Sequence, residues 1–127
     1  MATRSDAVRI VEALHGARVA GDLAAMCRLF ARTGEFRIAG ASADKPIAIA
    51  AATLEEFRPW LAMLVKVFKI NRYELLSLIV EDQRIAAHWR AEVLSKVTGV
   101  TVATELIDLL EIVEQKIVVY REFFVPR

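Results

Sequence analysis

The chain has 127 residues, 56% of them hydrophobic, and a mean hydropathy of +0.39. This length fits one domain, residues 1–127, around a single core. No apolar run approaches the roughly 18 uncharged residues that a membrane-spanning helix needs. The 17 basic residues are scattered and balanced by 16 acidic ones to a net charge of +1. We therefore expect neither nucleic acid nor a membrane as a partner.

Cysteine content and the N-terminal segment both favour the cytoplasm. A single cysteine, Cys27, excludes an internal disulfide, and disulfides are typical of oxidising compartments. The segment MATRSDAVRI lacks the apolar stretch of a signal peptide.

Two helices are expected in the first third of the chain. Ser5 or Asp6 can cap the first helix, and Gly21 stands where a left-handed residue would end it. Asp22 can cap the second helix. His15 has no residue of metal-ligand or catalytic type at a suitable spacing apart from a glutamate, so we assign it no chemistry. The apolar positions of the second helix recur at helical spacing and are Leu23, Met26, Cys27 and Phe30.

The next segment is expected to form a hairpin followed by a third helix. Residues 34–39 alternate as in a short strand, and a small polar turn leads to a second strand at 47–50. Thr53 and Glu56 have the spacing of a capping box, which opens a helix. Pro59 predicts that this helix either kinks or begins one residue before the proline.

Alternating patterns from residue 69 onward predict a long antiparallel sheet. Turn-like residues separate consecutive strands, as in a meander of hairpins. Helices before a long sheet indicate the α+β class. The four expected strands span residues 69–80, 84–97, 101–113 and 116–125.

Charged residues recur on one side of the last three strands, among mostly apolar neighbours. These candidate catalytic residues are Arg90, Glu92, Asp108 and Glu122. Three carboxylates around one guanidinium leave two surplus negative charges, which is costly in a dry interior. A pocket that admits water or holds one carboxyl protonated removes this cost, so we expect the cluster to line a ligand site. The candidate ligand-binding wall is Phe36, Ile38, His88, Leu94, Leu106, Leu110, Tyr120 and Phe124.

The opposite face of the expected sheet is also apolar. A monomer rarely exposes so large an apolar patch, so we expect a homodimer through this convex face. The residues concerned are Trp89, Val93, Ile107, Leu109 and Phe123.

The order of elements resembles the nuclear transport factor 2-like superfamily, which includes SnoaL-like cyclases, limonene-epoxide hydrolase and ketosteroid isomerase. The resemblance covers nearly the whole chain, from AGDLAAMCRLFA to KIVVYREFF. It implies a cone-shaped, cystatin-like fold, in which three N-terminal helices pack in the concave side of a curved antiparallel sheet. It also implies a pocket on that concave side and pairing of two subunits through the convex side.

The best residue-level match is to the acid, arginine, acid pattern of limonene-epoxide hydrolase. That resemblance implies that Glu122 and Glu92 act as base and acid, and that Arg90 orients them. The two residues that help to position water in that enzyme fall on Phe36 and Ile38, which cannot do so. The resemblance to ketosteroid isomerase leaves only its oxyanion-hole acid, at Asp108.

Two functions from different classes follow. The first is a cofactor-free acid-base enzyme, of hydrolase, cyclase or isomerase type, acting on an apolar small molecule. The second is a noncatalytic ligand-binding or dimerisation module. We expect no metal site and no cofactor, because the sequence contains no metal-ligand spacing and no phosphate-binding loop.

Overall fold

The computed structural model describes residues 4–39 and 49–126 and has the α+β architecture expected from the sequence. The predicted strand at 47–50 lies in part outside the described residues. Within the described part of the chain, no helix is long and apolar enough to cross a membrane. The helices are α1 (Arg4–Ala20), α2 (Leu23–Cys27) and α3 (Leu54–Val67). The strands are β1 (Phe30–Ile38), β2 (Ile49–Thr53), β3 (Phe68–Glu81), β4 (Arg84–Ser95), β5 (Thr101–Val113) and β6 (Lys116–Pro126).

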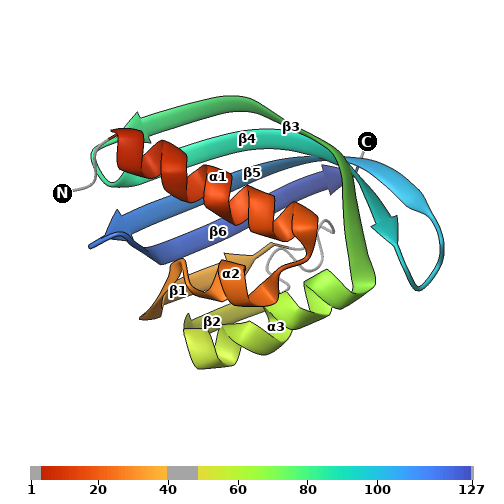
Figure 1. Cartoon of the computed structure of the whole chain (residues 1–127), viewed down its shortest axis with the longest axis horizontal. Coiled ribbons are helices and arrows are strands. Elements are labelled where there is room, and N and C mark those ends of the chain that lie inside the picture. The colour runs from red at the N-terminus through yellow and green to blue at the C-terminus, as the bar shows by residue number, and fades with distance from the viewer. Residues whose placement is uncertain (1–3, 40–48, 127) are drawn as a thin grey trace.

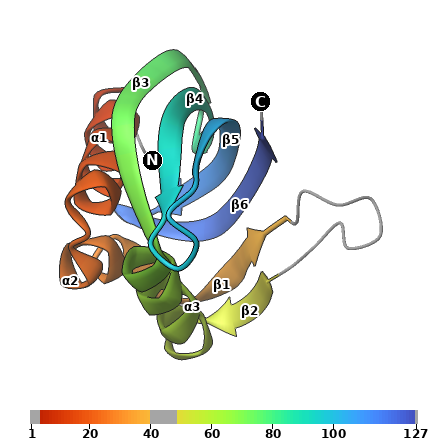
Figure 2. The same ribbon diagram turned by 90° about the vertical axis from the view of Figure 1, so that its right-hand side faces the viewer.

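All six strands form one curved sheet in the order β2-β1-β6-β5-β4-β3 (Figure 1). The predicted meander is present as β3 to β6, and β1 joins it by pairing parallel to β6. Helix α1 lies along one face of the sheet, and α3 lies beside β1 and β2 (Figure 2). The third helix therefore follows two strands and does not precede the whole sheet.

Helix starts follow the predicted caps. The side chain of Asp22 accepts a hydrogen bond from the Ala25 amide at 3.0 Å, which begins α2. This helix ends after five residues, and Phe30 begins β1. Thr53 accepts from the Glu56 amide at 3.1 Å, while Glu56 accepts from the Ala52 amide at 2.9 Å. These two caps, a variant of the capping box in which Glu56 binds the residue before the N-cap, start α3 at Leu54, so Pro59 lies inside the helix and does not mark its start.

The register of the meander decides which side chains face α1. We call the face that bears Trp89, Asp108 and Glu122 the inner face, and the opposite one the outer face. Trp89 pairs with Leu106 across β4 and β5, and directly paired residues point to the same face. Across β5 and β6, Asp108 pairs with Glu122.

A bulge in β6 produces the second of these pairings. Next to the turn, Ile112 pairs with Ile117, but one residue further Glu111 pairs with Val119. Val118 is therefore the extra residue, and it reverses the alternation of β6 relative to β5. Without this bulge, Glu122 would face away from Asp108.

Aromatic packing holds β1, α3 and β6 together beneath the bulge. The rings of Phe36 and Phe57 stack with their centroids 5.3 Å apart, and Phe30 meets both edge-on. All three are buried, as is Tyr120 beside them. Complete burial of each such ring stabilises the fold by roughly 2 to 3 kcal/mol, which fixes the start of β6 relative to the helices.

Candidate functional site

A cavity of about 380 Å³ lies on the inner face of the sheet. All three helices and the strands β1, β3, β4, β5 and β6 contribute to its wall. Two charged residues, Arg18 and Glu122, reach this wall, and its other residues are apolar or carry hydroxyl groups. An apolar cavity with a few convergent polar groups is the usual form of a small-molecule site.

Arg18 and Glu122 form a buried ion pair in the wall of the cavity. Arg18 lies in the last turn of α1, and its guanidinium donates to Glu122 Oε2. Tyr120, two residues earlier on β6, donates its hydroxyl to the same oxygen at 2.5 Å. Glu122 is 2% exposed. Both bonds end on Oε2, so neither of them occupies Oε1.

Asp108 is the second buried carboxyl and lies behind the cavity wall, close enough to Glu122 for the two side chains to interact. Its Oδ2 accepts from Trp89 Nε1 at 3.0 Å and lies 2.8 Å from His15 Nε2. His15 Nδ1 lies 2.6 Å from the Tyr73 hydroxyl. A neutral His15 satisfies both contacts by donating from Nε2 and accepting at Nδ1. Asp108 Oδ1 is buried and has no hydrogen-bond partner.

Burial and charge move the pKa values of the two carboxyls in opposite directions. Burial, together with the charge of Glu122, raises the pKa of Asp108 to about 6, although His15 opposes this shift. Burial also acts to raise the pKa of Glu122, but Arg18 and the hydrogen bonds with Tyr120 and Asp108 together outweigh burial and lower that pKa below its ordinary value. Glu122 is thus the more acidic member of the pair, and Asp108 is the one that takes up a proton as the pH falls through about 6.

Neighbouring groups are held in defined charge states. Burial acts to lower the pKa of Arg18, but Glu122, Tyr120 and Asp108 together outweigh burial and the net shift is upward, so the guanidinium stays charged. Burial and the nearby carboxyls raise the pKa of Tyr120 well above its ordinary value and that of Tyr73 to about 12. Arg18 also lies 5.5 Å from the centre of the Trp89 ring, which connects the two carboxyl networks.

The structure brings together two of the four candidate catalytic residues, and the predicted side of β4 is wrong. Asp108 and Glu122 lie on the inner face, whereas Arg90 lies on the outer face and bonds to Glu74 at 2.8 Å. Glu92, on that same outer side, lies 3.5 Å from Arg72. The reason is the register, which pairs odd-numbered residues of β4 with even-numbered residues of β5.

The candidate ligand-binding residues divide into three groups. Ile38, Leu106 and Phe124 line the cavity as expected. Phe36, Leu110 and Tyr120 are buried in the core instead, although Tyr120 reaches Glu122 from there. His88 and Leu94 share the side of β4 that bears Arg90; His88 contacts Glu105 there, so its expected place in the cavity wall is wrong.

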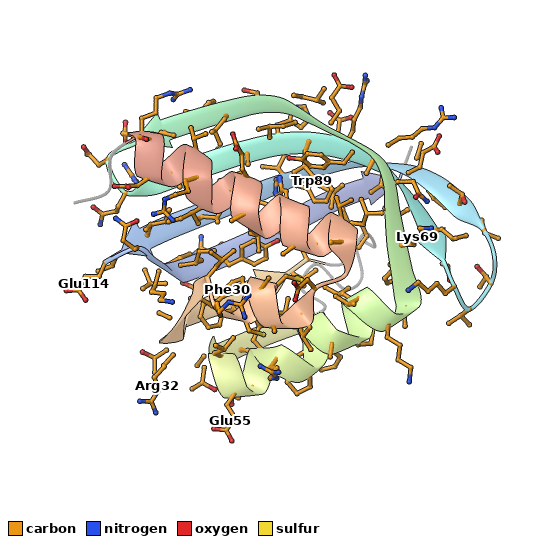
Figure 3. All side chains as sticks on the ribbon, viewed as in Figure 1. Phe30, Arg32, Glu55, Lys69, Trp89 and Glu114 are labelled. Carbon is orange, nitrogen blue, oxygen red and sulfur yellow. The ribbon has the colours of Figure 1, made fainter. Side chains whose placement is uncertain are left out.

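Four residues of the site were missed from the sequence: His15, Arg18, Tyr73 and Trp89. His15 and Arg18 are three residues apart on α1, which places them on the same helix face. That spacing was the available signal, because a histidine and an arginine within a buried stripe need polar partners. Trp89 was assigned to the convex face, but it is 1% exposed and lies beside α1 (Figure 3).

Comparison with known proteins shows the family. A family model for a SnoaL-like domain matches residues 9–120. The chain belongs to the SnoaL-like domain family. The comparison with curated proteins gave no match. Among the residues that the structure describes, no group of three or more histidine, cysteine or acidic side chains could hold a metal ion.

Solved structures share the fold of this SnoaL-like domain at low identity. A Bacillus subtilis protein to which isomerase activity is ascribed is 13% identical with a TM-score of 0.85, covering 98% of this chain and 89% of that one. An LEH-like epoxide hydrolase of M. tuberculosis is 12% identical with a TM-score of 0.75 and coverages of 94% and 83%. An NTF2-like protein of Burkholderia xenovorans LB400 is 19% identical with a TM-score of 0.77 and coverages of 98% and 92%. These likenesses support the NTF2-like fold.

Proposed function

We propose that this SnoaL-like domain binds an apolar small molecule in the inner-face cavity and performs cofactor-free acid-base chemistry on it. The observation that carries the proposal is the ion pair of Arg18 and Glu122, buried in an otherwise apolar wall. Burying charges is costly, and a structural role alone would be served as well by apolar residues of similar size. Of the expected trio Glu122, Arg90 and Glu92, only Glu122 reaches the cavity, and its cation is Arg18.

Glu122 is the general base in this proposal. It is ionised, it lines the cavity, and both Arg18 and Tyr120 bind its Oε2 rather than its Oε1. Oε1 can therefore take a proton from a bound water or from carbon beside a carbonyl group. Arg18 has further N–H groups beyond the one that binds Glu122, and these can stabilise negative charge that develops on a substrate oxygen.

Asp108 acts as a positioning residue that sets the charge beside the base. It lies directly opposite Glu122 and takes up a proton as the pH falls through about 6, and below that pH only one of the two carboxyls is negative. Ionisation of Asp108 would place two like charges side by side and change the basicity of Glu122. Glu92 and Arg90 have no part in this mechanism.

A noncatalytic binding module is the second candidate, and one observation favours it. The lowered pKa of Glu122 makes it a weak base, which suits a fixed ion pair better than proton transfer. In that case Arg18 and Glu122 orient a bound ligand and the domain releases it unchanged.

The two candidates are separated by turnover in a Glu122→Gln variant. Native mass spectrometry of the purified protein would first identify any retained ligand, and a panel of apolar epoxides, enones and polyketide-like esters would then be followed by mass. We expect the wild type to convert at least one class and Glu122→Gln to lose about 100-fold in rate. Arg90→Gln is the matched control and should keep full activity. No turnover of any class, with ligand binding unchanged by Glu122→Gln, would leave the binding module.

We further propose that two copies pair through the outer face of β5 and β6. Ile107, Leu109 and Phe123 are 43%, 37% and 44% exposed there and form a continuous apolar strip. Trp89 and Val93 were expected to join this surface. Trp89 is instead buried, and Val93 is part of the cavity wall. The strip is therefore narrower than the sequence predicted, and it lies over the two central strands.

A further inference from the structure

The cavity mouth is bordered by exposed apolar residues on the hairpin between β4 and β5 and on the junction of α3 with β3. Val97 and Val100 of the hairpin are 78% and 56% exposed, and Phe68 at the junction is 37% exposed. Val100 and Phe68 also line the cavity, so the exposed apolar surface continues into its wall. We call this surface the mouth rim, defined as Phe68, Val97 and Val100.

Positive charge gathers around the mouth rim, although the whole chain is nearly neutral. Residues 65–70 and 95–100, which carry the rim, contain three basic residues and no acidic one. Arg72 lies just beyond them and is paired with Glu92. Lys66, Lys69 and Lys96 are exposed, and each is the sequence neighbour of a residue that lines the cavity. Figure 3 shows Lys69 at this end of the molecule, away from Glu114 at the other end.

The hairpin and helix that carry the rim are fixed to each other. The Lys96 amide donates to the Val67 carbonyl at 2.7 Å, and Lys96 Nζ donates to the Val65 carbonyl at 3.3 Å. These bonds hold the tip of the hairpin against the C-terminal end of α3, where the two elements lie side by side in Figure 2. The apolar and basic groups therefore form one preorganised surface.

We propose that the mouth rim docks on an anionic lipid surface, from which an apolar ligand passes directly into the cavity. Exposed apolar side chains surrounded by lysines fit the acyl and headgroup layers of such a surface, respectively. The cavity opens within the same surface and has apolar walls, so a ligand dissolved in the lipid need not cross water. This departs from the expectation of no membrane partner, which rested on the net charge and on the scatter of basic residues along the sequence. The proposal does not depend on catalysis.

Co-sedimentation with vesicles tests the docking without any turnover measurement. The wild type should bind vesicles of phosphatidylcholine containing about a third phosphatidylserine, should bind pure phosphatidylcholine much more weakly, and should be released by about 0.5 M salt. Lys66→Gln/Lys69→Gln should weaken binding about 25-fold, because each lysine contributes about fivefold to the affinity. Val97→Ser/Val100→Ser should weaken it at least about tenfold.

Matched controls use residues at the far end of the sheet. Arg32→Gln/Arg84→Gln removes the same charge, and Ile79→Ser/Val113→Ser removes exposed apolar side chains, so both should bind as the wild type does. Circular dichroism confirms that each variant is folded. Equal binding to both vesicle types, control variants as weak as the rim variants, or no binding by the wild type would overturn the proposal. The last result would leave an acidic carrier protein as the occupant of the same surface.

Discussion

Asp108 and Glu122 lie directly opposite each other on β5 and β6, both buried, yet each has its own set of hydrogen-bond donors. His15 and Trp89 bind Asp108, while Arg18 and Tyr120 bind Glu122. Because Glu122 has the Arg18 guanidinium as a direct partner, the pKa of Glu122 is lowered while that of Asp108 is raised. The domain's stability and its proposed chemistry both depend on this difference.

Removal of Arg18 should be far more damaging than removal of Arg90. Arg18→Met leaves the Glu122 carboxylate buried without its cation and should lower the free energy of unfolding by about 3 kcal/mol. Arg90→Met breaks an exposed pair with Glu74 and should cost less than about 1 kcal/mol. Urea denaturation at neutral pH measures both values. Arg18→Met/Glu122→Gln should recover most of the loss, and a double variant as unstable as Arg18→Met would contradict the assignment.

The stability contributed by Asp108 should fall as pH rises. Its pKa is about 6 in the folded protein against an ordinary value of 3.8, so the fold favours the protonated form. The contribution is complete below about pH 4, is lost through about pH 6, and amounts to about 3 kcal/mol. The free energy of unfolding of Asp108→Asn, taken relative to that of the wild type, should therefore rise by about this amount between pH 4 and pH 7. Asp82→Asn, at an exposed turn, is the control, and a flat difference for Asp108→Asn would refute the shift.

Gly34 should tolerate no side chain. A Cβ at this position would come within 2.2 Å of the Val118 carbonyl oxygen at the β6 bulge and within 3.0 Å of the Phe36 ring. Gly34→Ala should therefore destabilise the fold by about 2 kcal/mol or more. Gly16→Ala, in α1 with open space around the new methyl group, should stabilise it by about 0.5 to 1 kcal/mol. Thermal unfolding of the pair gives the comparison, and equal melting temperatures would count against this close approach.

The proposed dimer has a direct test in the outer-face strip. The wild type should sediment at twice 14.2 kDa at micromolar concentration. Phe123→Asp places a charge in the strip and should give the monomer mass, because an unpaired carboxylate is costly to bury. Val97→Asp, on the β4–β5 hairpin, should remain dimeric. A monomeric wild type would refute pairing through this face.

The sequence predicted the elements better than the faces of its strands. Helix caps at Asp22 and Thr53 and the meander itself follow from local residue patterns, and all are present. The predicted inner face of β4 was wrong because alternation alone does not say which of the two alternating sets of side chains points inward. The turn between β4 and β5 held that information. The loop of residues 96–99, closed by the bond from the Ser95 amide to the Val100 carbonyl, pairs odd with even residues and thereby separates Arg90 from Asp108.

The correct grouping of Asp108 with Glu122 depended on a feature that no pattern reveals. The turn at Glu114 and Gln115 would by itself put the two carboxyls on opposite faces, and the extra residue Val118 corrects this. Bulges arise from packing between strands distant in sequence, here against Gly34 of β1. The roles of His15 and Arg18 were not predicted for a related reason, because their partners lie on β5 and β6, far away in the sequence.

The parallel pairing of β1 with β6 also orders the folding of this domain in time. The hairpins of β3 to β6 can form from neighbouring segments, but β1 must wait for a strand made much later in synthesis. Until β6 arrives, Phe30 and Phe36 lack Tyr120, and Arg18 has no Glu122 to neutralise it. A nascent chain at that stage exposes an apolar strand edge and an unpaired cation, which is the state that chaperones recognise and in which misfolding competes with completion of the site.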